Sequence, residues 1–420
     1  MMTREDNELL VHVGPGTPMG NMFRRFWLPC ALASEVGGPD SEPVKVDALG
    51  ESFVLFRDTD GRLGLLDAYC THRRAHLFWG RNEERGLRCV YHGWKFDVEG
   101  NCVDVPNCPE GDRIKKSVGT RSYPVMERGG MIWAYFGPKE LMPKPPATEI
   151  FDAPDSHRFI RKMVIKGNWL QHMEGDVDSS HISFLHSGLT GALPGSAINP
   201  AAFQDKAPRW VIKPTDYGVR LAAQRNSGPD HYSWRINQWL FPFATLIAAP
   251  QNWPFTANIR LPIDDETTIQ FRVWTNPDQP LTEEQLKIAN AGVIFPEMIP
   301  GTFTPKANSS NNYLIDREDQ RTKTYTGIKA IPSQDLAVIQ DQGYGNIADR
   351  SLEKLTSSDL AIVQIRKRLL DAVKALMAGT EPSEPKNMEA YRVRPIDFVL
   401  PRDVDLDDGE RDVLQRRAAE

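Results

Sequence analysis

The sequence predicts an α+β protein, in which a small all-β domain precedes a larger domain that combines an antiparallel sheet with helices. Its length of 420 residues exceeds the usual size of one domain, so two domains are expected. Short alternating runs separated by glycine turns fill the region from about residue 43 to residue 136. A proline-rich stretch then ends at Pro146, and longer strand-like and helix-like segments follow it.

The composition excludes several classes of protein. Apolar residues at 40% and charged residues at 25% are ordinary for a globular protein, and a net charge of −6 argues against nucleic acid or a membrane surface as partner. The N-terminus is polar and lacks the apolar region of a secretory signal, and the longest apolar run, 239–249, is about half a membrane span. We therefore expect a cytoplasmic protein. Its 5 cysteines then favour metal binding over disulfides.

The predicted all-β domain covers residues 41–140. Residues 1–40 are expected to form a segment that packs on the second domain. Residues 141–149 are expected to be a linker, because the chain around them is rich in proline and poor in apolar residues. Glycine at a tight turn between alternating runs is typical of a β-hairpin. Such turns occur at Asp60-Gly61, Glu99-Gly100 and Gly129-Gly130.

The second domain, residues 150–420, shows both strand and helix periods. Its clearest helix has Ser357 or Ser358 as a possible cap, apolar residues at helical spacing, and Gly379 at its end. We expect strands at 158–166, 209–214, 218–224, 233–249, 256–262 and 268–274, and helices at 168–185, 281–291 and 357–378.

The segment 168–186 of this domain concentrates side chains that can bind metals. Asp178 and His181 are three residues apart and share a face if the segment is helical. His181 and His186 are five apart, so both reach one ion only if the helix loosens or ends between them. Two histidines with one carboxylate form the facial triad of non-haem iron(II) oxygenases. The alternative is a helix whose histidines hydrogen-bond to the backbone or to water.

A second group of metal-binding residues lies in the all-β domain. Cys70 and His72 form one pair, Cys89 and His92 form another, and sixteen residues separate the two pairs. Zinc accepts two cysteines and two histidines, whereas a Rieske [2Fe–2S] cluster takes two cysteines on one iron and two histidines on the other. The spacing C-x-H and C-x-x-H-G-W-x-F on hairpins favours the Rieske cluster over zinc or an unliganded pair of thiols.

Together these motifs resemble the oxygenase subunits of the Rieske non-haem iron aromatic-ring hydroxylases, and most of all the phthalate dioxygenase group. The resemblance extends over nearly the whole chain. It rests on Cys70-x-His72, Cys89-x-x-His92-Gly-Trp-Lys-Phe, Asn168-Trp, Asp178-x-x-His181-x4-His186, the opening Gly14-Pro-Gly-Thr-Pro-Met, Asn311-Asn-Tyr-Leu-Ile-Asp-Arg-Glu and Ser357-Ser-Asp-Leu-Ala-Ile-Val.

The resemblance implies a Rieske domain followed by a catalytic domain of helix-grip type, with a [2Fe–2S] cluster and a mononuclear iron(II). It implies Asp359, near the start of a late helix, as the third iron ligand beside His181 and His186. Asp178 would hydrogen-bond to His181 and reach His92 of the partner subunit. Asn168 matches a position close to the iron that is not itself a ligand.

The chemistry and the resemblance both indicate that several copies of the chain assemble. One chain is expected to hold its two metal sites far apart, and a closed ring of subunits pairs the cluster of one with the iron of the next. We expect a homotrimer, with a stacked hexamer as the alternative. The resemblance implies that electrons come from NADH through a separate flavin and iron–sulfur reductase. The sequence has no GxGxxG in a βαβ context, so this chain is not expected to bind the nicotinamide itself.

The expected substrate is an aromatic compound, in particular an aromatic carboxylate. The strand 234–247, together with Phe184 and Leu185, is the expected pocket wall, and Arg235 is its only cation. Ser179 and Ser180 are further candidate donors, while Arg209, Arg220 and Arg225 are expected to be solvated. The expected reaction is cis-dihydroxylation. The alternatives are a monooxygenase that removes O- or N-methyl groups, an electron carrier without oxygenase activity, and a zinc-stapled binding protein.

Overall fold

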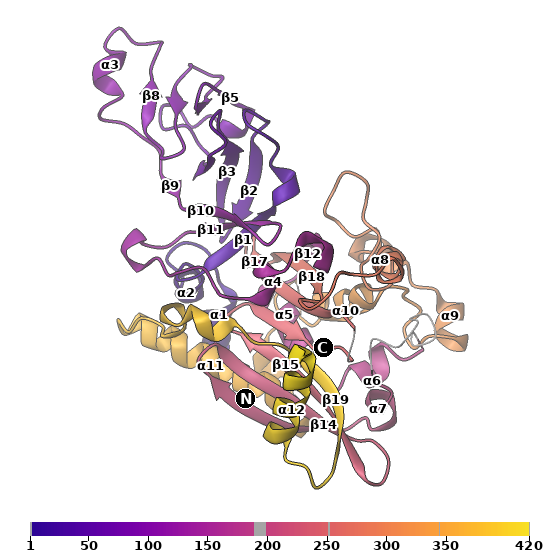
Figure 1. Cartoon of the computed structure of the whole chain (residues 1–420). Coiled ribbons are helices and arrows are strands. Elements are labelled where there is room, and N and C mark those ends of the chain that lie inside the picture. Colours follow the sequence, from indigo (N-terminus) through magenta and orange to yellow (C-terminus); the bar gives the residue numbers. More distant parts are fainter. Residues whose placement is uncertain (1, 189–198, 251–252, 344, 420) are drawn as a thin grey trace. The chain divides into compact units, whose positions relative to one another are not determined.

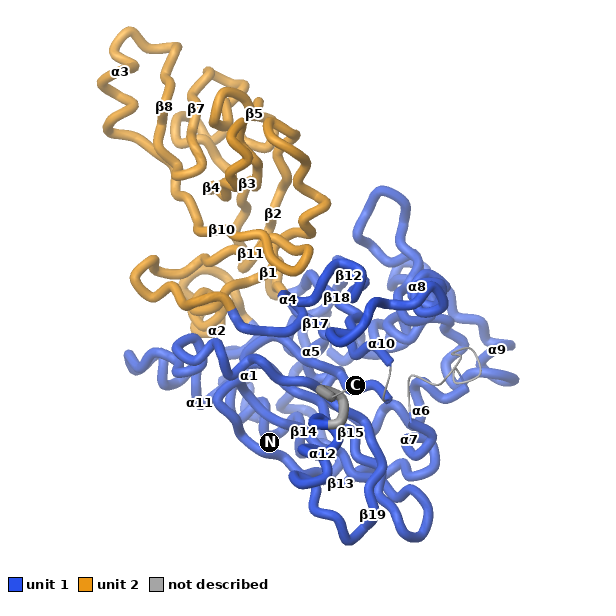
Figure 2. The backbone as a smooth tube through the Cα atoms, in the orientation of Figure 1, with its two compact units in different colours: residues 1–11, 146–260, 266–420 blue, residues 12–145, 261–265 orange. Residues whose placement is uncertain are grey.

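The chain forms two separately packed units, which Figure 2 distinguishes by colour. The computed structural model describes residues 2–188, 199–250, 253–343 and 345–419. Within these ranges, no helix has the length and apolar character that crossing a membrane requires. Unit 1 comprises Met1–Val11, Pro146–Arg260 and Glu266–Glu420, and unit 2 comprises His12–Pro145 and Leu261–Asp265.

The boundaries of the units differ from the expected ones. The expected N-terminal segment, 1–40, is divided, because only residues up to Val11 group with unit 1. Residues Trp27–Leu32 (β1) instead pair with Met131–Tyr135 (β11) inside unit 2. The expected linker, 141–149, runs directly into the short helix Glu149–Asp152 (α4). Pairing between strands that are distant in sequence sets the first boundary, and composition does not reveal such pairing.

Unit 2, which is described throughout, contains three antiparallel sheets. The buried carboxylate of Asp58 fixes one hairpin turn by accepting the N–H groups of Asp60 and Arg62. All three predicted hairpins are confirmed, as β3–β4, β7–β8 and β10–β11. One sheet has the strand order β2 (Val44–Ala48), β3 (Glu51–Arg57), β4 (Leu63–Asp67) and β9 (Ser122–Tyr123), and a second has the order β5 (Arg81–Glu83), β6 (Gly86–Arg88), β7 (Lys95–Phe96) and β8 (Cys102–Asp104). The third sheet has the order β1, β11 and β10 (Val125–Arg128). The short helices α2 (Pro18–Phe23) and α3 (Gly111–Ile114) also belong to this unit.

Unit 1 is built on one large antiparallel sheet (Figure 1). The predicted strand 233–249 is two strands, β15 and β16, because Pro242 has no N–H to donate to a sheet ladder and the chain turns back there. The described strands follow the order β12 (Arg158–Lys166), β18 (Thr267–Thr275), β17 (Phe255–Pro262), β16 (Ala244–Ile247), β15 (His231–Leu240), β14 (Gly218–Asn226) and β13 (Arg209–Thr215), and β19 (Ile396–Pro401) pairs with β15.

The predicted helix over 168–185 is interrupted. Helix α5 (Trp169–Val177) ends at Asp178, and α6 (Ile182–Leu185) is a separate single turn. The Asp178 carboxylate accepts the N–H of Ser180, and this local turn competes with continuation of the helix. The helices predicted at 281–291 and 357–378 are confirmed as α8 (Glu283–Asn290) and α11 (Leu360–Met377). The other α-helices in the described part of unit 1 are α1 (Arg4–Val11), the single turn α7 (Ala201–Gln204), α9 (Arg317–Thr322), α10 (Ile331–Gln340) and α12 (Leu406–Ala419), besides α4.

Helix α5 is the element that positions the site. It packs against α1, α10 and α11, and its side chains Trp169, Leu170, Met173 and Val177 are fully buried. Burying each such side chain contributes about 1.5–3 kcal/mol, so the helix is held firmly. The buried carboxylate of Glu174 adds ion pairs to Arg350 of the loop before α11 and to Arg366 of α11. The C-terminal end of α5, which leads into Asp178 and His181, is therefore fixed by the core.

Candidate metal centres

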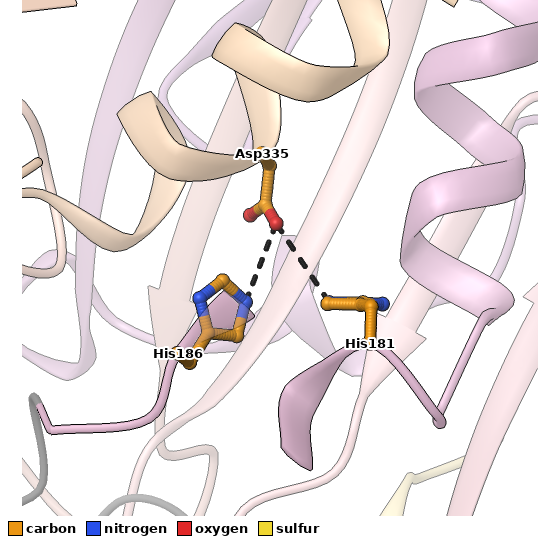
Figure 3. A group of neighbouring side chains, drawn as sticks. All are labelled: His181, His186 and Asp335. Carbon is orange, nitrogen blue, oxygen red and sulfur yellow. Dashed lines mark ion pairs between the residues drawn. The ribbon is translucent and has the colours of Figure 1, made fainter. Parts of the chain in front are cut away.

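Three side chains of unit 1, His181, His186 and Asp335, converge on one point (Figure 3). Their nearest ligand atoms all lie within 4.8 Å of one another. Oδ1 of Asp335 is 3.3 Å from Nε2 of His186 and 3.7 Å from Nε2 of His181. Two imidazoles and one carboxylate at this spacing match the facial triad that binds iron(II).

The local fold explains how two histidines five residues apart meet. Helix α6 is only one turn long, with His181 at its first end and His186 at its last. Both imidazoles therefore project from the ends of a short turn rather than from the faces of a long helix. Asp335 comes from α10, and Figure 3 shows its carboxylate pointing from that helix toward the two rings.

A neighbouring amide fixes the tautomer of His186. Nε2 of Gln334 donates to the carbonyl of Ile328 at 2.7 Å, so Oε1 of Gln334 faces Nδ1 of His186 at 2.8 Å. An amide oxygen only accepts, so Nδ1 of His186 carries the proton. The lone pair is then on Nε2, the atom that faces Asp335, which is the arrangement that metal-binding histidines use.

Asp178 lies on the other side of His181, with Oδ2 at 3.5 Å from Nδ1 of the ring. Burial alone would raise the pKa of the Asp178 carboxyl, but His181 and the donors of Ser180 hold that pKa well below its usual range. Burial opposes a positive charge on His181, yet Asp178 and Asp335 together raise its pKa. The two carboxylates thus favour a cation at His181, either a proton or a metal ion.

Asp359, the expected third ligand, is not part of this group. Its Oδ2 accepts the N–H of Thr356 at 2.7 Å and the hydroxyl of Thr356 at 3.0 Å, which makes it the acidic member of a capping box before α11. Two helices late in the chain carry an aspartate near their start. The aspartate that faces the two histidines is Asp335, which the resemblance did not single out.

Asp335 and the helix that carries it are absent from the residues predicted from the sequence. A signal exists: Pro332 is typical of the first turn of a helix, and Leu336 and Ile339 place an apolar face beside an acidic residue. Carboxylates are rarely buried without a partner, so an aspartate on such a face is a candidate ligand. Asn168, by contrast, is a structural residue at the start of α5: its Oδ1 accepts the N–H of Leu170 and its Nδ2 donates to the carbonyl of Val11.

A cavity of about 110 Å³ adjoins this group. Ile182, Ile247, Trp274, Ile294 and Ile331 give it apolar walls, and alternate residues of the sheet add the polar side chains Arg235, Asn237, Thr256 and Arg272.

The cavity agrees only in part with the predicted wall. Arg235 and Ile247 line it as expected, whereas Phe184 is exposed and packs near Tyr325. Arg225, expected to be solvated, is buried and donates to Ser179, so the Ser179 hydroxyl is already engaged. Arg272 was not singled out from the sequence, because the direction of its side chain depends on the register of β18.

The second group lies in unit 2, at the tips of two loops. Cys70 and Cys89 are buried, and the rings of His72 and His92 are 4.5 Å apart at 74°. Nδ1 of His72 is buried and has no hydrogen-bond partner in the part of the chain that the structure describes. A buried ring nitrogen without a partner is costly unless it has a ligand, so these residues fit a metal cluster.

The surroundings of Cys70 oppose a negative charge on its thiol. Burial, and next the adjacent Cys89, raise the pKa of Cys70 to about 11, although backbone N–H groups of His72 and Arg73 oppose the rise. Bound iron would reverse this and keep the thiols deprotonated. Trp94 stacks on His72 at 4.7 Å between ring centroids, and its Nε1 donates to Asn107. His76 stands apart, since its Nδ1 accepts the N–H of Phe78.

Comparisons with known proteins cover both units. A family model described as "Rieske [2Fe-2S] domain" matches residues 26–124, and one described as "LigXa C-terminal domain like" matches residues 134–411. The chain is 42% identical over 397 residues to a phthalate 4,5-dioxygenase oxygenase subunit of Pseudomonas putida, covering 90% of this chain and 88% of that one. It is 38% identical over 423 residues to a 3-chlorobenzoate-3,4-dioxygenase oxygenase subunit of Comamonas testosteroni, covering 96% and 97%. A crystal structure of dicamba monooxygenase with 3,6-dichlorosalicylic acid has the same fold, with a TM-score of 0.60 at 19% identity, covering 84% of this chain and 98% of that one.

Proposed function

The chain belongs to the Rieske non-haem iron oxygenases, and from this premise we propose that it hydroxylates the ring of an aromatic carboxylate. It is the oxygenase subunit of an oxidoreductase that works with a reductase and contains a [2Fe–2S] cluster and a mononuclear non-haem iron. When bound, the cluster supplies single electrons and the iron activates dioxygen. We assign Cys70, Cys89, His72 and His92 to the cluster, and His181, His186 and Asp335 to the mononuclear iron.

The substrate class is inferred from Arg235, a cation that lines a largely apolar cavity beside the proposed iron ligands. Apolar walls suit an aromatic ring, and a guanidinium binds a carboxylate through two parallel hydrogen bonds. Nε of Arg235 is buried without a hydrogen-bond partner in the described residues, and Nη1 is 3.6 Å from Oδ2 of Asp397 on the paired strand β19. Burial raises the pKa of Asp397, although Arg235 and a hydrogen bond from Asn199 oppose the rise. Arg235 thus retains donors for a substrate anion.

Within the site, the side chains around the proposed iron ligands have different roles. Gln334 holds His186 in one tautomer, and Asp178 does the same for His181. The apolar residues around them exclude water from the bound ring, which strengthens the contact between Arg235 and a carboxylate. An aromatic ring whose acidic group binds Arg235 would therefore lie in the cavity that adjoins the proposed iron ligands.

We further infer a homotrimer, with a stacked hexamer as the alternative, in which Asp178 reaches His92 of the partner subunit. Asp178 remains 23% exposed although its Oδ1 is engaged by Ser180, and His92 is also partly exposed. Electrons would arrive from a reductase fed by NADH, and cysteines whose spacing favours metal binding over disulfides fit a cytoplasmic location.

A single turnover with ¹⁸O₂ tests the proposed reaction. Chemically reduced, iron-loaded protein is mixed with benzoates, benzenedicarboxylates or methoxybenzoates, and the products are read by mass spectrometry. We expect two labelled oxygen atoms in one product. One labelled atom, or a lost methyl group, would instead establish monooxygenation or demethylation. If no aromatic acid yields a labelled product while the cluster spectrum is intact, the proposed function is wrong.

A further inference from the structure

A buried guanidinium group, that of Arg225 on β14, holds the turn that leads from Asp178 to His181. Its Nη1 donates to Oγ of Ser179 at 3.1 Å, and its Nη2 donates to the carbonyl of the same residue at 2.5 Å. Its Nε donates to the carbonyl of Asp205 at 3.0 Å. Because a guanidinium is planar and rigid, these three bonds together fix the position of Ser179 against the sheet.

Arg225 lies on the face of the sheet that meets the proposed iron site. In the β14–β15 ladder, Arg225 pairs with Ser233, and two positions along each strand Ala223 pairs with Arg235. The two arginines are therefore diagonal neighbours on one face. Arg235 lines the cavity, whereas neither Arg225 nor Ser179 is among the described residues that line it. Arg225 thus reaches the site through Ser179 and not through the cavity.

The turn that Arg225 holds is the break between α5 and α6. Oδ1 of Asp178 accepts the N–H of Ser180 at 2.7 Å and its hydroxyl at 2.8 Å, which closes the turn locally. The bonds from Arg225 to Ser179 tie the same turn to a strand that is distant in sequence. His181 follows directly, so the place of its ring depends on both sets of bonds.

The charge of Arg225 is costly at this position. All the hydrogen bonds that Arg225 donates to described residues end on uncharged oxygen atoms. Burial, and next the charge of Arg235, lower the pKa of Arg225 to about 10. Three aspartates, Asp205, Asp397 and Asp178, oppose this fall. An arginine nevertheless suits the position, because its rigid fork presents several donors in fixed directions to a hydroxyl and two carbonyls.

We propose that Arg225 is a positioning residue for the mononuclear iron, which acts through Ser179 to hold Asp178 and His181 in place. This inference rests on the proposed function, since it takes His181 as an iron ligand. It adds to that function a residue that contacts neither the iron ligands nor the cavity. Residues that orient metal ligands typically change metal affinity when they are replaced, even though they do not bind the metal.

A set of variants of the full-length protein tests this proposal. Arg225→Met removes the guanidinium and keeps a long unbranched side chain, and Arg225→Lys keeps the charge. Ser179→Ala removes one of the acceptors, and the double variant of Arg225→Met with Ser179→Ala shows whether the two residues act together. Arg220→Met is the matched control, because Arg220 is a buried arginine of the same strand whose partners, Asp407 and Glu410, belong to α12.

Two measurements report on the iron and one on the fold. Competition with a chelator gives the affinity for iron(II) at the mononuclear site. The electron paramagnetic resonance signal of the iron(II) protein with nitric oxide reports the geometry of the ligands. The melting temperature reports stability, and the visible spectrum of the cluster shows that unit 2 is intact.

We expect Arg225→Met to weaken iron binding by about tenfold or more and to change the nitric oxide signal, as for other residues that orient metal ligands. Arg225→Lys should lose less, because its ammonium group still donates to Ser179. Ser179→Ala should show a smaller change of the same kind, and the double variant should lose little more than Arg225→Met, since both act through one contact. Arg220→Met should lower the melting temperature and leave both iron measurements as in the wild type.

Wild-type iron affinity and an unchanged nitric oxide signal in Arg225→Met would overturn the proposal. Additive losses in the double variant, or an equal loss in Arg220→Met, would overturn it too, because Arg225 would then act through general stability. In these cases ring hydroxylation by the wild type would leave the proposed function standing. If the wild type itself binds no mononuclear iron, the proposed function fails and this inference fails with it. If Arg225→Met does not fold, Arg225→Lys and Ser179→Ala are read by the same measurements, and wild-type values in both would overturn the proposal.

Discussion

The two candidate metal sites differ in how the chain supplies their ligands. The proposed cluster ligands lie between Cys70 and His92, at the tips of neighbouring hairpins within unit 2. The proposed iron ligands extend from His181 to Asp335, and they meet only because α10 packs on α5. A site built from adjacent hairpins can be read from spacing, since turn geometry fixes where each side chain points. A site completed by a distant helix depends on tertiary packing, which spacing does not contain.

The largest expected effects come from removing one ligand at each site. Cys89→Ala should abolish the visible absorption of the cluster and all turnover while the mononuclear iron remains. His181→Ala should abolish turnover and the mononuclear iron while the cluster spectrum stays unchanged, because the two sets of ligands belong to separately packed units. Metal analysis with visible and electron paramagnetic resonance spectra measures both. Loss of both metals in either variant would mean that the two motifs form one site.

The next effect separates two aspartates that the sequence does not distinguish. Asp335→Ala should remove the mononuclear iron and turnover, since it removes the carboxylate nearest both histidines. Asp359→Ala should keep the iron and most activity and should lower the free energy of unfolding by about 0.5–2 kcal/mol, the cost of losing a helix cap. Iron content and chemical denaturation decide between them. The opposite pattern would restore Asp359 as the ligand.

The features that could be predicted from the sequence are those set by local residues, and the features that could not are those set by distant packing. Strand β12, Arg158–Lys166, has the predicted bounds, and the three glycine hairpins are confirmed, because alternation and turn residues are local signals. The interruption at Asp178 was missed, because a side chain that caps a turn overrides helix periodicity. Asp335 and Arg272, which line the cavity, were not singled out for a different reason. Whether each side chain lines it depends on which face of α10 or β18 meets the cavity, and packing with elements far away in the sequence sets that face.

A smaller effect is expected where the two sites would be joined between subunits. Asp178→Asn keeps the size of the side chain but removes the charge beside His181. Both metals should remain bound, and electron transfer from cluster to iron should slow by about 10- to 100-fold, as for other residues that orient metal ligands. Stopped-flow measurement of cluster oxidation in the presence of substrate gives this rate. A rate near that of the wild type would refute the proposed bridge to His92 of the partner subunit.

The smallest expected effect concerns an iron ligand that is oriented within its own subunit. Gln334→Leu removes the oxygen that accepts the Nδ1 proton of His186 but keeps a buried side chain of similar length. His186 can then adopt the other tautomer, in which Nε2 is protonated and does not bind a metal. Iron affinity should fall by about tenfold, at the low end for such residues. Competition with a chelator measures this affinity, and the cluster spectrum should be unchanged. Gln334→Glu serves as the matched variant: it keeps an acceptor for Nδ1 but loses the donor to the carbonyl of Ile328, so it should bind iron more tightly than Gln334→Leu. If both variants lose iron equally, Gln334 acts through packing of α10 rather than through the tautomer of His186.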